Sequence, residues 1–224
     1  MQTRTAWPPF TKNLQITVVA LIILWVVGVE FTGFVDEYML VSRDAVVGRG
    51  HVWTLLTYSL FHFDFSHLLF NGLALWMFGG ELDRRWGDKW FWAFCALCAL
   101  GGGLAIVGAQ LIFGSNYPTL GYSGAVMGLV AAYCWHNWNR PLYFFFVKMS
   151  GKWLLLLFVG LDLFMVLGAQ QPISISGHIG GMVTGLLLVT GYWRPSEAKK
   201  AYRRWKTRRN FRKQTKKPED KRWN

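Results

Sequence analysis

Charge is scarce in the first 193 residues of this 224-residue chain. From residue 194 onward, 14 Lys and Arg face only three acidic residues, so this tail carries +11 of the net +12. Hydrophobic residues make up 53% of the chain and aromatic residues 17%. A nearly neutral, strongly apolar body with a basic tail excludes an ordinary soluble domain. It indicates a membrane-embedded protein.

Cysteine is also rare, with three residues that all lie in apolar runs: Cys95, Cys98 and Cys134. A disulfide scaffold uses more cysteines in polar loops, so we expect these three to be small core residues. Metal-binding signatures are missing as well. There is no H-E-x-x-H, and no carboxylate lies at ligand spacing from His62, His67 or His178, so we expect neither a metal nor a cofactor.

Long apolar runs, in contrast, are abundant. They predict an all-α, polytopic bundle of six transmembrane helices, at about 14–35, 65–81, 90–113, 123–138, 152–169 and 178–193. The predicted organisation is a short cytoplasmic N-terminus (1–13), the six-span body (14–193) and a basic, partly disordered cytoplasmic tail (194–224). The first run, from Leu14 to about Val29, lacks a cleavage site and is followed by further runs, so a secretory signal is not indicated.

Orientation follows from the basic residues between the runs. One set of flanks, including the tail, carries 22 Lys and Arg, whereas the other set carries only Arg43 and Arg49 in the 36–64 loop. The positive-inside rule then places both termini in the cytoplasm. We expect a bacterial-type cytoplasmic membrane, and we expect the aromatic residues of the 36–64 loop to lie at its outer interface. Directly after a membrane helix, the basic tail favours anionic lipid headgroups as partner over nucleic acid.

Polar side chains within apolar spans are costly and are therefore functional candidates. His67 and Asn71 are four residues apart and project from one helix face. Ser123 and His178 each stand at the predicted start of a span that follows an uncharged external loop. The charge-derived orientation places all four in the outer half of the bundle.

Glycine spacing predicts close contact between the fourth and sixth spans. Gly124 and Gly128 form one small-xxx-small pair, and Gly177, Gly181 and Gly185 form a glycine face on the sixth span. This contact would bring Ser123 within hydrogen-bonding reach of His178.

A serine with a histidine base is a nucleophilic pair for acyl transfer. The backbone N–H of Ser123, the Asn71 amide and the His67 imidazole are candidate donors to the oxyanion. Asp162 lies about midway along the fifth span, which is too deep to reach His178. The sequence therefore predicts a Ser–His dyad, with Asp162 paired to another polar group in the bundle.

The motifs resemble those of the rhomboid family of intramembrane serine proteases over about residues 50–190. They are H-F-x-x-x-H-L-L-F-N (His62, His67, Asn71), G-Y-S-G (Gly121, Ser123, Gly124) and G-H-I-G-G-x-x-x-G (His178, Gly181, Gly185). The resemblance implies a six-span fold in which Ser123 is the nucleophile, His178 the general base and acid, and His67 and Asn71 the oxyanion donors. Gly121, Gly124, Gly181 and Gly185 would pack at the site. One departure is Met127, where many family members have tyrosine.

The activity implied is a serine endopeptidase that cleaves membrane-anchored proteins within or next to their transmembrane segment. The alternative is a catalytically silent, rhomboid-like binder or chaperone of membrane proteins, but such proteins lose the dyad and this chain retains both members. A transporter would show a repeat between its halves or broken helices, and the sequence has neither feature.

Overall fold

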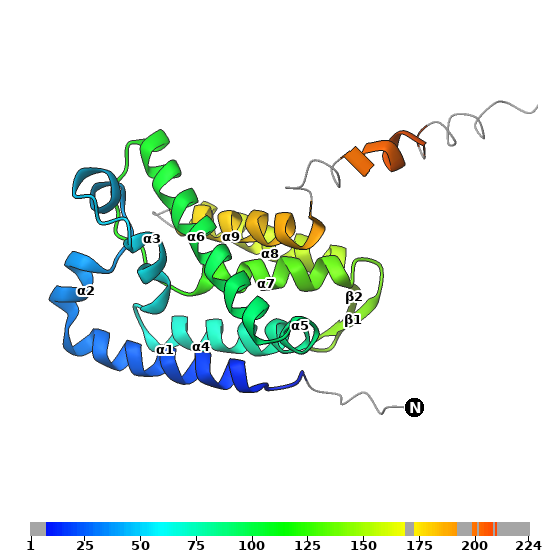
Figure 1. Ribbon diagram of the computed structural model, residues 1–224, viewed down its shortest axis with the longest axis horizontal. Coiled ribbons are helices and arrows are strands. Elements are labelled where there is room, and N and C mark those ends of the chain that lie inside the picture. Colours follow the sequence, from blue (N-terminus) through cyan, green and yellow to red (C-terminus); the bar gives the residue numbers. More distant parts are fainter. Residues whose placement is uncertain (1–7, 169–172, 192–198, 201, 208, 210–224) are drawn as a thin grey trace, which may run out of the picture. The chain divides into compact units, whose positions relative to one another are not determined.

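The computed structural model describes residues 8–168, 173–191, 199–200, 202–207 and 209 (Figure 1). The chain divides into two compact units, Met1–Leu186 and Leu187–Asn224. In the second unit, the described residues of the predicted basic tail are helical. The remainder of that tail, and residues 1–7 of the predicted N-terminus, lie outside the described residues.

Helices dominate the described parts of the chain. In order, the elements are α1 (Lys12–Glu30), α2 (Thr32–Tyr38), η1 (Asp44–Gly48), α3 (Thr54–Thr57), η2 (Tyr58–Leu60), α4 (Phe65–Ala74), η3 (Leu75–Gly79), α5 (Gly80–Trp86), α6 (Asp88–Phe113), α7 (Ser123–His136), β1 (Pro141–Phe144), β2 (Val147–Ser150), α8 (Gly151–Gly168) and α9 (Ile173–Thr190). Helical segments therefore lie at all six predicted ranges. By length and composition, α1 and α6 are the two helices within the described parts that could cross a membrane, and 175–190 is a shorter apolar helix.

The helix ends differ from the prediction in three places. The first range breaks at Phe31 between α1 and α2, and the second continues through η3 and α5 to Trp86. The last helix begins at Ile173, five residues before the predicted start at 178. The hydropathy pattern does not predict this extra turn, because its Ser and Gly residues lower the local hydropathy. Both residue types are nevertheless well tolerated near a helix N-terminus. His178 consequently lies in the second turn of α9 and not at its start.

A small β-hairpin between α7 and α8 corrects the all-α prediction. Strands β1 and β2 pair antiparallel, with Pro141 opposite Ser150 and Phe144 opposite Val147. Phe145 closes the turn with a φ of 52°. The segment is rich in aromatic residues, which favour strands, but it is too short to show a clear alternation. The all-α prediction is therefore wrong for this segment.

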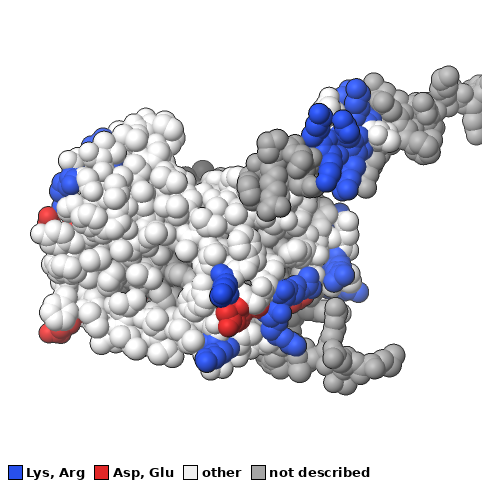
Figure 2. All heavy atoms as spheres, viewed as in Figure 1, with Lys and Arg blue, Asp and Glu red and all other residues white. Residues whose placement is uncertain are grey.

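The surface of the first unit is apolar where a soluble protein would be polar. Apart from Lys12, Gln15 and Glu30, the exposed side chains of α1 are hydrophobic. Helices α6 and α8 likewise expose many large apolar side chains. Figure 2 shows charged side chains gathered toward two ends of this unit, with a wide uncharged band between them. Apolar patches of this extent mark a surface that is covered in the functional state, here by lipid tails.

Helix α7 lies at the centre of the bundle and packs against α6 and α8 (Figure 1). Nine of its 14 residues are buried, including five alanines and glycines that allow neighbouring backbones to approach. The three cysteines are buried and free, as predicted. Because α7 begins at Ser123, a largely buried helix carries the candidate nucleophile at its first residue.

Candidate active site

The segment that leads into Ser123 is fixed by the loop between α2 and α4. Val41 and Thr119 exchange both backbone hydrogen bonds, at 3.1 and 2.9 Å, and the Gly121 N–H donates to the Tyr58 carbonyl at 3.0 Å. These backbone contacts set the position at which α7 starts. Burial raises the pKa of Tyr58, so its hydroxyl stays protonated and donates to the Ala99 carbonyl at 2.9 Å.

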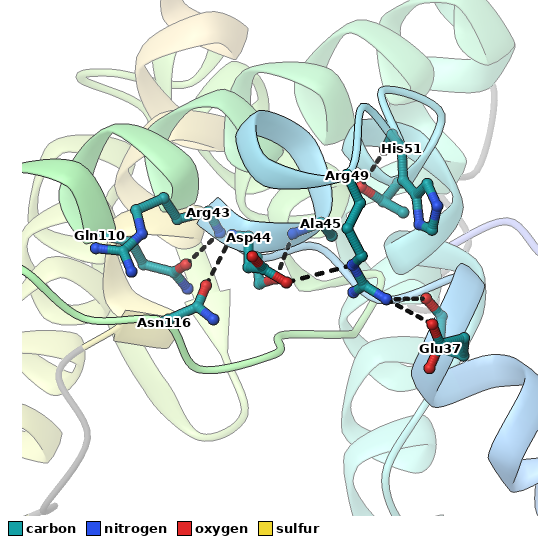
Figure 3. A network of polar contacts seen from close by, with 10 residues as sticks. Glu37, Arg43, Asp44, Ala45, Arg49, His51, Gln110 and Asn116 are labelled. Carbon is teal, nitrogen blue, oxygen red and sulfur yellow. Dashed lines mark hydrogen bonds and ion pairs between the residues drawn. The ribbon is translucent and has the colours of Figure 1, made fainter.

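A polar network holds the same loop against the end of α6 (Figure 3). The fully buried Gln110 accepts a hydrogen bond from the Arg43 backbone N–H at 2.6 Å and donates to the Tyr117 carbonyl at 2.7 Å. Asn116 accepts from the Asp44 backbone N–H at 2.8 Å. Arg49 bridges Asp44 and Glu37 on the exposed side, where ion pairs contribute little to stability. The buried amide therefore makes the anchoring contact.

Helices α7 and α9 touch backbone to backbone, as the glycine spacing predicts. A Cβ on Gly181 would overlap the carbonyl oxygen of Gly124, and a Cβ on Gly185 would lie 2.6 Å from the carbonyl oxygen of Gly128. A Cβ on Gly177 would meet the Ile106 side chain on α6, whereas the Gly177 carbonyl oxygen faces α7, 3.4 Å from where a Cβ on Gly124 would lie. The glycine contact is close enough to bring side chains at the same level of α7 and α9 together.

Ser123 and His178 meet at this level. The Ser123 Oγ lies 2.8 Å from the His178 Nε2, within hydrogen-bonding distance. On the other side of the ring, the His178 Nδ1 lies 2.9 Å from the Asp162 Oδ1. The expectation that Asp162 is too deep to reach His178 was therefore wrong.

Asp162 and His178 lie at similar depths in the bundle because of where α8 ends and α9 begins. Asp162 lies six residues before the last residue of α8, and His178 lies five residues after the first residue of α9. At a rise of about 1.5 Å per residue, these offsets are about 9 and 7.5 Å along two consecutive helices. The side chains of His178 and Asp162 are 20% and 12% exposed, so the pair is largely shielded from solvent.

A cavity of about 230 Å³ opens beside the pair. It is lined by Tyr58, His67, Ile106, Thr119, Leu120, Ser123, Gly124, Gly177 and His178. The structure thus brings three of the four predicted site residues around one space, namely Ser123, His178 and His67. Such a concave, mostly apolar space with a few convergent polar groups is typical of a small binding site.

Asn71, the fourth predicted site residue, is not among the cavity-lining residues. Its Nδ2 lies 3.0 Å from the His62 Nε2, and the Tyr122 backbone N–H donates weakly to the same nitrogen at 3.4 Å. Burial lowers the pKa of His62 to about 4, with a smaller contribution from His67. The neutral ring keeps a lone pair on Nε2, which can accept from the Asn71 amide.

Gly121 has a steric reason to be glycine. Its φ of 127° lies in the region that favours glycine. A Cβ there would lie 2.5 Å from the His67 Cε1 and 2.8 Å from its Nε2. The absent side chain gives the His67 imidazole room beside the residues that precede Ser123.

Three residues at the site had no assigned role from the sequence. His62 is the first residue of the H-F-x-x-x-H-L-L-F-N motif, and its spacing to His67 is the sequence feature that points to it. Tyr58 was one aromatic residue among several in its loop, of which Phe63 and Trp53 are exposed and Phe61 is buried. Asp162 was noticed as an intramembrane carboxylate but placed at the wrong depth. Across the described residues, no cluster of three metal-ligating side chains occurs.

A hydroxyl and an imidazole in hydrogen-bonding contact beside a cavity are able to carry out acyl transfer. The fold presents this pair inside a bundle of apolar helices, with a carboxylate on the far side of the imidazole ring. Together these features define a class: apolar helical bundles that enclose a serine–histidine pair.

Comparisons with known proteins agree. The model of the Rhomboid domain matches residues 49–195. The chain is 31% identical over 151 residues to Rhomboid protease GluP of Bacillus subtilis, covering 64% of this chain and 27% of that protein. Over 189 residues it is 23% identical to Rhomboid protease GlpG of Pectobacterium atrosepticum, covering 83% of this chain and 62% of that protein.

The chain belongs to the rhomboid family, and it is an integral membrane protein with a polytopic helical fold. Relatives named as rhomboid proteases place it in a family of intramembrane proteases. The chain spans 27% of the length of the Bacillus subtilis relative and 62% of that of the Pectobacterium relative.

Proposed function

We propose that this chain is an intramembrane serine endopeptidase that hydrolyses membrane-anchored proteins within or next to their transmembrane segment. The observation that carries the proposal is the 2.8 Å contact between the Ser123 Oγ and the His178 Nε2 beside a cavity. Intramembrane polar residues are costly unless they serve a function. Here a nucleophile and its base share one hydrogen bond.

The proposed chemistry is acyl transfer. The Ser123 Oγ attacks the peptide carbonyl while the His178 Nε2 accepts its proton and later returns it to the leaving amine. A water molecule then gives a proton to the His178 Nε2 and attacks the acyl-enzyme carbonyl. The bond to the Ser123 Oγ breaks, the Oγ regains the proton from His178, and the carboxylic acid product leaves. The developing oxyanion would be stabilised by the Ser123 backbone N–H at the start of α7 and by His67, which lines the cavity. Asn71 would donate through the amide hydrogen that His62 does not occupy.

We propose six membrane crossings, at the six helical segments, with both termini in the cytoplasm. The 22 Lys and Arg on one set of flanks against two on the other support this orientation. The active site would then open toward the outer side of a bacterial cytoplasmic membrane. Anionic lipid headgroups are the proposed partner of the basic tail, and no nucleic-acid partner is proposed.

Substrate choice should depend on helix stability. A peptide bond in a stable helix is shielded by its own backbone hydrogen bonds, so the proposed substrates are transmembrane segments whose outer end carries Gly, Pro or other helix-weakening residues. The cavity beside Ser123 is small, and this supports a small residue before the scissile bond.

The experiment that tests the function uses full-length protein in liposomes with a single-span reporter. We expect cleavage near the outer end of the reporter helix, located by mass spectrometry, and we expect a fluorophosphonate to label the protein and block cleavage. A protein that binds the reporter but neither cleaves it nor reacts with the probe would instead be the catalytically silent binder.

The contact between His62 and Asn71 gives a quantitative prediction for the oxyanion site. Removing one oxyanion donor typically lowers kcat by about 10²–10³-fold, so we expect a loss of this size for Asn71→Ala. His62→Ala should lower kcat by a smaller factor, because it frees the Asn71 amide from its contact but leaves the amide in place. In the double variant the loss should equal that of Asn71→Ala alone, since the two residues act through one contact.

Steady-state cleavage of the reporter provides the measurement, and His51→Ala is the matched control. His51 stacks on Tyr38 and Trp53, away from the cavity, and its replacement should leave kcat within about threefold. Losses that multiply in the double variant would show that His62 acts independently of Asn71.

A further inference from the structure

Asp162 is the acidic residue of α8, in a helix that is otherwise almost entirely apolar. Its side chain is largely buried, the Oδ1 lies 2.9 Å from the His178 Nδ1, and within the described residues the Oδ2 has no hydrogen-bond partner. A carboxylate in such a place is costly and is retained when it serves a function. Among the described residues, its polar contact is with the proposed catalytic base.

Both ring nitrogens of His178 are engaged. The Nε2 lies 2.8 Å from the Ser123 Oγ and the Nδ1 lies 2.9 Å from the Asp162 Oδ1. An ionised carboxylate can only accept hydrogen bonds, so the proton of the neutral ring belongs on Nδ1. The lone pair is then on Nε2, directed at the hydroxyl whose proton a base must take.

We propose that Asp162 is a positioning residue that turns the predicted Ser–His dyad into a Ser–His–Asp triad. It holds His178 in the Nδ1–H tautomer and stabilises the imidazolium that forms when Nε2 accepts the Ser123 proton. The Nδ1 proton stays on the ring throughout, and the Nε2 proton passes on to the leaving amine. This inference rests on the proposed protease function.

The environment makes this stabilisation large. When His178 gains a proton inside an apolar bundle, the new positive charge has little water to solvate it. A carboxylate in hydrogen-bonding contact supplies the opposite charge before the reaction begins, so no reorganisation is needed. In a serine protease of another fold, replacing the triad carboxylate by an amide lowers kcat about 10⁴-fold through the wrong tautomer.

The contrasting view is that Asp162 only ties α8 to α9. A purely structural contact would also favour the Nδ1–H tautomer, but its loss would change stability and leave the kcat of the folded variant nearly unchanged. A positioning role requires that kcat fall together with the shift of the proton from Nδ1 to Nε2. The tautomer and kcat, measured on the same variant, therefore separate the two.

The test uses full-length protein with ¹⁵N-labelled histidine in detergent micelles, and His178→Ala identifies the His178 signals. We expect wild-type His178 to carry its proton on Nδ1. In Asp162→Asn, whose amide can donate to Nδ1, the Nε2-protonated form should rise. For reporter cleavage we expect kcat to fall on the order of 10³-fold in Asp162→Asn with KM within about threefold, since Asp162 does not line the cavity. Asp162→Glu should recover at least about tenfold in kcat over Asp162→Asn.

Thr17→Val is the matched control, because it also removes a buried polar contact, from the Thr17 hydroxyl to the Asn13 carbonyl, but it lies on α1. It should leave both kcat and the His178 tautomer unchanged. The proposal is overturned if wild-type His178 carries its proton on Nε2, a result that needs no variant to fold. It is also overturned if Asp162→Asn cleaves at the wild-type rate. A wild-type protein that does not cleave would refute the proposed function, and the tautomer comparison would still decide the pairing.

Discussion

Ser123→Ala is expected to abolish cleavage of the membrane reporter and labelling by the fluorophosphonate. The substitution removes the Oγ that lies 2.8 Å from the His178 Nε2, and no other hydroxyl of the described residues has that contact. Removing the nucleophile of a serine protease of another fold costs about 10⁶-fold in kcat, which places the variant below detection. His178→Ala should lose cleavage and labelling to a similar extent, because the serine then lacks its base.

The fold should survive Ser123→Ala. The lost hydrogen bond contributes only about 1 kcal/mol to the free energy of unfolding, so the melting temperature in detergent should change little. Ser59→Ala is the control, since the buried Ser59 hydroxyl donates to the Leu56 carbonyl at 2.7 Å outside the cavity. It should remain active within a few-fold. Cleavage by folded Ser123→Ala would refute the assignment of the nucleophile.

Gly181→Ala is expected to disable the proposed protease from a position that does not line the cavity. A Cβ at this position would overlap the Gly124 carbonyl oxygen and lie 2.7 Å from its carbonyl carbon. Both are backbone atoms, so no side chain can rotate away and α9 must shift from α7. Because His178 is on α9 and Ser123 on α7, their hydrogen bond must lengthen. We expect at least about a 10²-fold fall in labelling rate, since small misplacements at a reacting centre have effects of this size.

Stability should fall as well, by about 1–3 kcal/mol, as is typical of overpacked cores. The matched control is Gly108→Ala on α6, where a Cβ would meet no atom within 4 Å. It should leave the labelling rate unchanged and the melting temperature equal or slightly higher, because alanine is the better helix former. If Gly181→Ala and Gly108→Ala react with the probe equally fast, the glycine contact does not position the site.

The sequence predicted the helical bundle well because its signals are local. Long apolar runs separated by charged flanks fix where helices can lie, and the small-residue spacing of Gly124, Gly128, Gly181 and Gly185 fixes which helices can touch. The contact between Ser123 and His178 follows from those two facts. The β-hairpin at 141–150 was missed because four-residue strands give too little alternation for a pattern to appear.

Tertiary structure decided the polar contacts around the proposed catalytic pair. His62 reaches Asn71 and the Tyr122 backbone only because the loop between α2 and α4 folds back against the start of α7. Residue spacing along the sequence does not predict how such a loop folds. The length of α9 was equally decisive. Because α9 begins at Ile173, His178 lies about one and a half turns from the first residue of the helix instead of at its start. At this depth it meets Asp162.

By itself, the sequence determined a membrane-embedded helical bundle, its rhomboid motifs and the residues able to carry acyl-transfer chemistry, since composition, periodicity and motif spacing are properties of the chain. It could not determine the depth at which side chains of different helices meet. That depth depends on helix ends, where weakly apolar Ser and Gly leave hydropathy ambiguous, and on how closely backbones pack. The partner of His178 is therefore a property of the folded bundle: a shift of one or two turns along α9 decides whether the imidazole faces apolar side chains or the Asp162 carboxylate.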